Sequence, residues 1–274
     1  MAQPGNKHQP GPVTNIASQL NSPLKLASGR EIADLNGVRG ANNPDGATVY
    51  GVRDAMPVCL AQAPGLQSAG GTFSHPYSSG PVAGGVYVGD AGANTILFVT
   101  DAGAVSLVKA LPAEPVTVDA RFAALAAEMG MPVPDCMLGL DYWAEAVPTS
   151  RAMSGQWLYY KVLPGAPGME LGYGKAYRMN VRSGTTQLLA EGLAAPTGIA
   201  VDKDNNVHDS QLMGDGVVEV KNGTATTVLP AMMSSDVAVT GSTLVALANA
   251  FDEVNEGNGG NGGNGGNLVT MALK

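Results

Sequence analysis

Four segments of the chain share one pattern of hydrophobic and polar positions. Each begins with a short apolar run, turns through Gly, Asp or Asn, and returns as a second apolar run. Short apolar runs bounded by turn residues are typical of β-strands rather than of helices. The pattern predicts a repeated strand–turn–strand unit at residues 74–99, 146–160, 195–220 and 235–248.

The spacing of these segments indicates the kind of repeat. Val201 and Val239 lie 38 residues apart, and Pro148 and Pro196 lie 48 residues apart. Blades of β-propellers repeat at roughly 40–50 residues, so the spacing fits one blade per repeat. We therefore expect an all-β chain folded as a β-propeller of four-stranded antiparallel blades.

Two further segments supply the remaining strands of a blade. Residues 217–229 form two runs around Asn222-Gly223, which is a strong hairpin signal because a type I′ turn needs positive φ at both central residues. Residues 176–193 form two runs around Arg182-Ser183-Gly184 in the same way. Each of the two segments predicts an outer hairpin.

One region departs from the strand pattern. The apolar residues between 118 and 130 step by four, three and four, which places them on one helical face: Val118, Phe122, Leu125 and Met129. Gly130 follows as a plausible helix stop. We expect a short inserted helix that packs across one end of the ring of blades.

The two ends of the chain carry weaker signals. Residues 1–12 are polar and rich in Gly and Pro, and we expect a disordered leader. Residues 13–27 are expected to form two short strands, and residues 31–41 a short helix that stops at the turn residues 42–46.

At the other end, residues 257–267 form a Gly/Asn repeat that we expect to be a flexible loop. Residues 267–273 then return as the last strand, which closes the ring with residues 13–20. Residues 13–274 are thus expected to form one propeller domain.

Composition and charge exclude several partners. Hydrophobic residues make up 45% of the 274 residues, which suffices for a packed core, and the net charge is -8. Binding to nucleic acid or to an anionic membrane needs clustered Lys and Arg, and the sequence contains no such cluster. No run of 18 apolar residues predicts a transmembrane segment.

Several motifs together resemble the ScyD/ScyE family. They read ADL, ANNPDG, SHPY, YVGDAGANTIL, AVPTS and PTGIAVD, at residues 33–35, 41–46, 74–77, 87–97, 146–150 and 196–202. The resemblance runs in order over residues 13–273, and DAGANTIL is its most specific piece. It implies a six-bladed propeller similar to NHL-type and gluconolactonase-like proteins, export from a bacterial cell, and a link to scytonemin biosynthesis.

The chain departs from that family near its N-terminus. Family members usually have two blades between the segments that correspond to residues 22–27 and 33–35, whereas these segments are nearly contiguous here. We therefore expect four clear blades and a partial one, instead of six.

Localisation depends on the resemblance. Residues 1–12 contain no charged region followed by an apolar core, as a signal peptide would. The protein is therefore either cytoplasmic or an exported protein whose signal peptide is absent from this chain. The resemblance favours an extracellular or periplasmic location.

Cys59 and Cys136 are the only two cysteines. An even number in an export-type fold favours a disulfide, which here would close 77 residues and contribute about 4.5 kcal/mol in the chain-entropy model. The alternative is two unrelated buried thiols.

Candidate ligand-binding residues lie next to the turns of two repeats. His75, Asp90, Asn94 and Asp236 could present polar groups at the mouth of a central channel. The structural alternative is that Asp and Asn here bond to the backbone of their own turns. Gluconolactonase-like relatives bind a divalent cation through carboxylate and amide oxygens, and the matching set is Asp90, Asn94 and Asp236.

The sequence contains no GxSxG, HExxH, CxxC or P-loop motif. His208, Asp209 and Ser210 are consecutive, but neighbours on a strand face opposite sides and cannot form a triad among themselves. No catalytic residue or obligatory cofactor is therefore assigned. The first hypothesis is an exported propeller that binds a small molecule or a protein, or serves as a scaffold; the alternative is a metal-dependent, gluconolactonase-like hydrolase.

Overall fold

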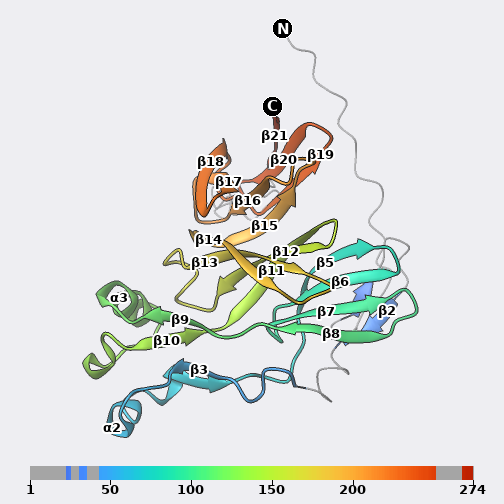
Figure 1. Cartoon of the computed structure of the whole chain (residues 1–274). Helices are drawn as coiled ribbons and strands as arrows, with labels where there is room; N and C mark the ends of the chain where they lie inside the picture. Colours follow the sequence, from blue (N-terminus) through green and yellow to red (C-terminus); the bar gives the residue numbers. More distant parts are fainter. Residues whose placement is uncertain (1–22, 26–30, 36–42, 251–266, 274) are drawn as a thin grey trace, which may run out of the picture.

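Antiparallel β-sheets dominate the described part of the chain, and four of them are stacked in the order of the chain (Figure 1). The computed structural model describes residues 23–25, 31–35, 43–250 and 267–273. The expected leader, most of the Gly/Asn loop and residues 13–20 lie outside these residues. Within them, no helix has the length and apolar character needed to cross a membrane.

Four of the sheets are propeller blades, at the four segments that the repeat predicts. Blade 1 consists of β5 (Pro76–Val82), β6 (Gly85–Asp90), β7 (Thr95–Thr100) and β8 (Val105–Ala110). Blade 2 consists of β11 (Ala146–Ser154), β12 (Trp157–Pro164), β13 (Gly174–Asn180) and β14 (Thr186–Leu193). Blade 3 consists of β15 (Pro196–Val201), β16 (Val207–Gln211), β17 (Gly216–Lys221) and β18 (Thr224–Pro230).

Within the described residues, blade 4 has three strands: β19 (Asp236–Thr240), β20 (Thr243–Ala248) and β21 (Asn267–Ala272). The returning strand predicted at residues 267–273 is confirmed, since β21 pairs with β20 over its whole length. The Asn222-Gly223 turn is confirmed as well, with φ of 52° and 82° at its two residues.

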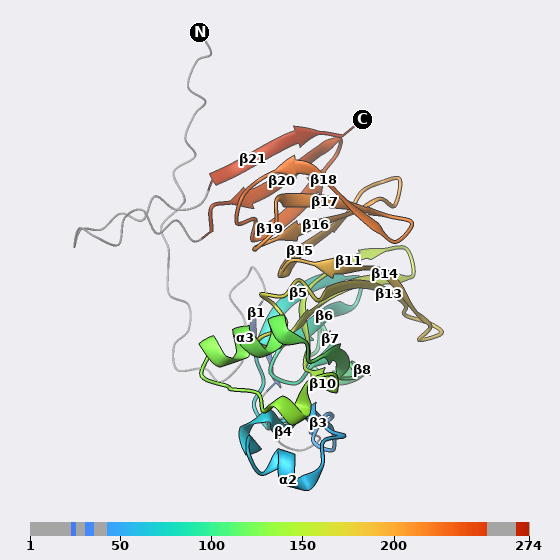
Figure 2. The ribbon, with the colours of Figure 1, turned by 90° about the vertical axis from the view of Figure 1, so that its left-hand side faces the viewer.

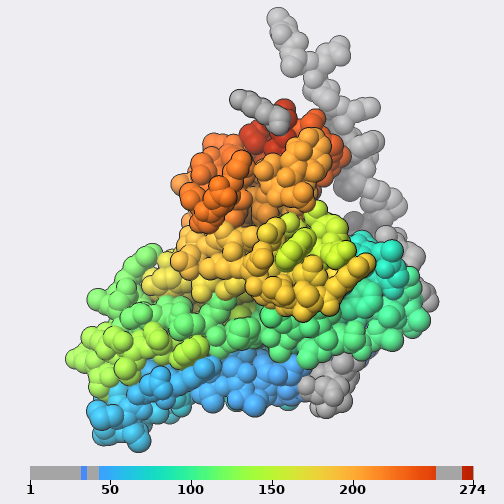
Figure 3. Space-filling view, in the orientation of Figure 1, coloured from blue at the N-terminus to red at the C-terminus, as the bar shows by residue number. Residues whose placement is uncertain are grey.

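The blades follow one another as in a propeller. The first strands β5, β11, β15 and β19 lie side by side in that order, and the successive blades form layers in Figures 2 and 3. Separate apolar clusters fill the spaces between neighbouring blades. The all-β propeller fold with four clear blades is therefore confirmed.

A further sheet of four strands, the insert sheet, interrupts this series in the order β4–β3–β10–β9. The chain contributes β3 (Val49–Val52) and β4 (Gln67–Ala69) before blade 1, and β9 (Glu114–Thr117) and β10 (Asp141–Ala144) after it. Short helical segments connect these strands: α2 (Pro57–Leu60), η1 (Pro64–Leu66), α3 (Ala120–Glu128) and η2 (Asp135–Met137). We call the sheet with these segments the insert.

Helix α3 confirms the helix predicted between residues 118 and 130. Asp119 is its N-cap and accepts a hydrogen bond from the backbone N–H of Phe122 at 2.7 Å. Gly130 has φ of 77° just beyond the end, where a left-handed residue is favoured. The buried helix residues Phe122 and Ala126 pack in the insert's apolar cluster, which also includes Leu171 from the loop between β12 and β13 of blade 2.

The disulfide between Cys59 in α2 and Cys136 in η2 is confirmed, with 6.1 Å between the two Cα atoms. It joins the part of the insert that precedes blade 1 to the part that follows it. Cys59 belongs to the same apolar cluster as Phe122 and Met137, so covalent and hydrophobic contacts stabilise one core.

A short hairpin precedes the insert and is the partial blade. It pairs β1 (Pro23–Lys25) with β2 (Glu31–Asp34), and Ile32, Ala33 and Leu35 pack on blade 1. The helix predicted over residues 31–41 is therefore wrong at residues 31–34, where strand pairing with β1 satisfies the backbone. Residues 36–42 lie outside the described part of the chain.

Candidate ligand cleft

A cleft of about 440 Å³ lies between the insert and blade 2. Its walls come from strand β9, from the loop before β13, and from β13 and β14. A volume of this size falls in the range of roughly 300–1,000 Å³ that is typical of small-molecule sites. The lining residues are Glu114, Pro115, Val116, Thr117, Asp119, Pro164, Gly172, Tyr173, Lys175, Glu191 and Gly192.

Glu114 is the buried polar centre of this cleft. One of its oxygens, Oε2, lies 2.7 Å from Nζ of Lys175, and the other, Oε1, accepts a hydrogen bond from the hydroxyl of Tyr177 at 2.6 Å. Burial raises the pKa of Tyr177, and the hydrogen bond to the carboxylate raises it further. Glu114 therefore fastens strand β9 of the insert to strand β13 of blade 2.

The alternation of strand residues explains this arrangement. In β9 the side chains of Glu114 and Val116 are buried while those of Pro115 and Thr117 are exposed. In β13, Lys175 and Tyr177 are two residues apart and so lie on one face of blade 2. Tyr177 also stacks on its cross-strand partner Tyr160, with ring centroids 5.4 Å apart, which fixes the ring that bonds Glu114.

Asp90, a sequence-predicted site residue, binds the backbone of its own turn. Its Oδ1 accepts hydrogen bonds from the backbone N–H groups of His75, Gly92 and Ala93, at 2.8, 3.1 and 3.2 Å. Its Oδ2 accepts a hydrogen bond from the hydroxyl of Ser74. The carboxylate is buried, so these contacts support the structural reading of this turn. His75 itself is exposed.

Asn94 belongs to a different network that joins blade 1 to the insert. Its amide donates to Asp45 Oδ2 and to the hydroxyl oxygen of Tyr50, each at 3.1 Å, and Tyr50 in turn donates to Asp45 at 3.0 Å. All three residues are buried, and burial together with Asp45 raises the pKa of Tyr50. Asn94 thus anchors the insert.

Asp236 lies in blade 4, at the start of β19, where it is exposed and accepts a hydrogen bond from the N–H of Val237 at 2.9 Å. Asp90, Asn94 and Asp236 therefore belong to three separate sets of contacts. Among the described residues, no three His, Cys, Asp or Glu side chains form a group that could hold a metal ion. Calcium or zinc binding remains a prediction for calorimetry.

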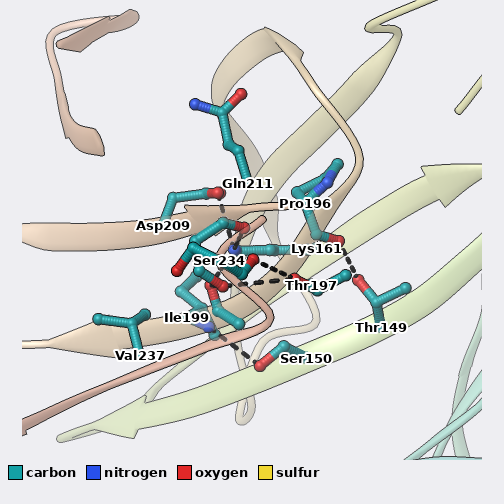
Figure 4. A network of polar contacts seen from close by, with 12 residues as sticks. Thr149, Ser150, Lys161, Pro196, Thr197, Ile199, Asp209, Gln211, Ser234 and Val237 are labelled. Carbon is teal, nitrogen blue, oxygen red and sulfur yellow. Dashed lines mark hydrogen bonds and ion pairs between the residues drawn. The ribbon is translucent and has the colours of Figure 1, made fainter. Parts of the chain in front are cut away.

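A buried ion pair between blades 2 and 3 was missed by the sequence reasoning (Figure 4). Nζ of Lys161 in β12 lies 2.9 Å from Oδ1 of Asp209 in β16, and both side chains are fully buried. Nζ also donates to the carbonyl oxygen of Gly198. Burial lowers the pKa of Lys161 against the effect of Asp209, and burial raises the pKa of Asp209 to about 6.

Hydroxyl groups surround this ion pair and join blade to blade (Figure 4). Thr149 of blade 2 donates to the carbonyl of Pro196 in blade 3 at 2.7 Å. Thr197, which follows Pro196 as Thr149 follows Pro148, donates to the carbonyl of Ser234 before blade 4 at 3.2 Å. We call these contacts the polar seam. Because Lys161 and Asp209 are fully buried, a ligand has no access to their charged atoms. The polar seam therefore has a structural role.

The comparisons with known proteins bear little on this site. No family model and no curated protein matches the chain. Among solved structures, the computationally designed Ika4 protein is similar over 73% of this chain and 92% of its own, with 12% identity and a TM-score of 0.41. Streptogramin B lyase is similar over 72% of this chain, with 14% identity and a TM-score of 0.38; the match spans 54% of the lyase. The fold assignment therefore rests on the sheets themselves.

Proposed function

We propose that the protein is an exported binding protein of the propeller class, whose small-molecule site is the cleft between the insert and blade 2. The cleft carries the proposal because it combines a suitable volume with a buried, oriented carboxylate at Glu114. Sites that bind small molecules usually combine mainly apolar walls with a few fixed polar groups. Pro115, Val116, Pro164 and Tyr173 supply such walls.

Binding is favoured over catalysis by the state of the titratable groups. Lys161, His208 and Asp209 are buried away from any substrate, and Glu114 is held by Lys175 and Tyr177. A general acid or base must reach the proton that it transfers. No arrangement among the described residues favours the metal-dependent hydrolase as a second candidate.

The cellular context of the proposal comes from the ScyD/ScyE resemblance and from the disulfide. A disulfide that joins two distant parts of a chain is typical of proteins in oxidising compartments. The resemblance and the disulfide both support export to the periplasm or beyond. The resemblance also supports a ligand from secondary metabolism. A protein partner would then bind elsewhere on the surface.

A blocking variant tests the proposed site. Thr117 lines the cleft and is exposed on β9, where an aromatic side chain suits a strand, so Thr117→Trp places a bulky side chain at the wall of the cleft and leaves the buried face of β9 unchanged. A metabolite library is screened by thermal shift against the wild-type protein. At a ligand concentration about a hundredfold above Kd, we expect Tm to rise by roughly 5–10 °C.

Thr226→Trp is the matched control, because Thr226 is exposed on β18 in blade 3 and outside the cleft. Library hits should stabilise the wild type and Thr226→Trp but not Thr117→Trp. Hits that stabilise all three proteins equally, or a library without hits, would contradict the proposed site.

A further inference from the structure

The charges on the cleft walls do not cancel. Three carboxylates line it, at Glu114, Asp119 and Glu191, against one ammonium group at Lys175. Lys175 is paired with Glu114 at 2.7 Å, so these two charges neutralise each other. Asp119 and Glu191 remain, and they make the walls of the cleft negative.

A hydrogen bond fixes the first of the remaining carboxylates, and the strand register sets the position of the second. Asp119 is held at the start of α3 by the hydrogen bond from Phe122, so it occupies the helix end that would otherwise attract an anion. Glu191 lies in β14 directly opposite Lys175 in the strand register. The two acidic residues therefore come from different modules, Asp119 from the insert and Glu191 from blade 2.

The rest of the lining suits the hydrocarbon part of a ligand. Pro115 and Pro164 are aliphatic members of the lining, and Tyr173 is its aromatic member. Aromatic faces attract ammonium and guanidinium groups through their quadrupole. A negative cleft with apolar and aromatic walls thus favours a ligand that combines a positive charge with a hydrocarbon part.

We propose that the cleft binds a small organic cation, an aliphatic amine or guanidine, whose charged group is neutralised by Asp119 and Glu191. The hydrocarbon part of the ligand packs against Pro164 and Tyr173. This inference rests on the proposed function, because it names the class of ligand for the same cleft.

Three probes of equal carbon number isolate the effect of ligand charge. Calorimetric titrations use 1,5-diaminopentane, 1,5-pentanediol and glutarate, which are positive, neutral and negative at neutral pH. We expect the diamine to bind at least about tenfold more tightly than the diol, and glutarate not to bind. The preference for the diamine should shrink in about 0.5 M NaCl, because salt screens partly exposed charges.

Charge-removing variants locate the binding groups. Asp119→Asn keeps a good N-cap while it removes the charge, so the helix remains intact. Asp119→Asn and Glu191→Gln should each weaken diamine binding roughly threefold to fivefold, since partly exposed charge pairs are modest in strength. Asp101→Asn, in the turn between β7 and β8, removes the same charge away from the cleft and should leave the affinity unchanged.

The outcomes separate the two proposals. Equal or tighter binding of the diol or of glutarate, or no binding of the diamine to the wild type, overturns the cationic ligand. Loss of diamine affinity in Asp101→Asn as large as in Glu191→Gln overturns it as well, because the effect would then reflect net charge alone. Library hits that Thr117→Trp abolishes would still support the cleft as a binding site.

Discussion

The polar seam and the insert are held together by different chemistry. Between blades 2 and 3, a fully buried Lys161–Asp209 pair and the hydroxyl of Thr149 contact the neighbouring blade. In the insert, Phe122 and Met137 pack in an apolar cluster that a disulfide crosses. The seam uses polar side chains where the insert uses hydrophobic and covalent contacts.

This difference follows from the repeat. The chain just before or at the start of each blade offers a backbone carbonyl to the preceding blade, so a Thr in the same place of each repeat can donate to it, as Thr149 and Thr197 do. The insert interrupts the repeat and has no equivalent neighbour. It is built from two pieces of chain that are far apart in the sequence. A cross-link between such pieces is strongly stabilising, because it closes a long loop.

The largest effect is expected in the insert. Replacing both cysteines, Cys59→Ser with Cys136→Ser, should lower the free energy of unfolding by about 4.5 kcal/mol, because the unfolded chain regains the freedom of a 77-residue loop. Urea denaturation followed by circular dichroism measures the loss. Wild-type protein treated with a reductant should lose a similar amount, and a loss below about 1 kcal/mol would contradict the stabilising role of the disulfide.

Replacing one residue of the buried ion pair should destabilise the protein strongly, whereas replacing both should destabilise it only weakly. Lys161→Met leaves the charge of Asp209 buried without its partner, so we expect a loss of about 4 kcal/mol. Lys161→Met with Asp209→Leu removes both charges and should recover most of that stability, since apolar replacements of a buried pair are often neutral. A double variant as unstable as the sum of its single variants would contradict this account of the seam.

The pH dependence of stability gives a smaller effect. Burial raises the pKa of Asp209 to about 6 in the folded protein, above its ordinary value of 3.8, so the folded state binds its proton more tightly. The stabilising contribution of that proton is present below pH 3.8 and is lost as pH rises through about 6. Between pH 4.5 and 6.5, the stability of the wild type relative to the double variant should fall by about 2 kcal/mol. A relative stability that rises over this range would contradict the raised pKa.

The smallest effect concerns one hydroxyl of the seam. Thr197→Val removes the hydrogen bond to the carbonyl of Ser234 and should cost about 1 kcal/mol. Thr226→Val, at an exposed position of β18, is the control and should change stability by less than about 0.5 kcal/mol. Equal losses in the two variants would show that the hydroxyl of Thr197 contributes nothing specific.

The blades could be predicted from the sequence because their signals are local. Apolar alternation and turn residues such as Asn222-Gly223 lie within a few residues of the strands that they define. Helix α3 was predicted for the same reason, from the spacing of Val118, Phe122 and Leu125. Pairing with β1 determines the strand at residues 31–34, and the local pattern there did not indicate it.

The cleft and the seam depend on contacts between distant residues, so the sequence pattern did not indicate them. Glu114 bonds Lys175 and Tyr177 only because β9 lies beside blade 2. One local signal was available for the seam: Lys161 interrupts the apolar run Trp157–Pro164, which is unusual for a lysine. Its partner Asp209 lies in a predicted strand, but only the fold brings the two side chains together.

Mapping of a library hit by protein-observed NMR tests the central claim most directly. If the cleft is the ligand site, the largest shifts will fall on Gly172, Tyr173, Lys175, Glu191 and Gly192. Shifts concentrated instead on the turn of Asp90 and Asn94, with these residues unchanged, would contradict the account and return the ligand site to the blade turns.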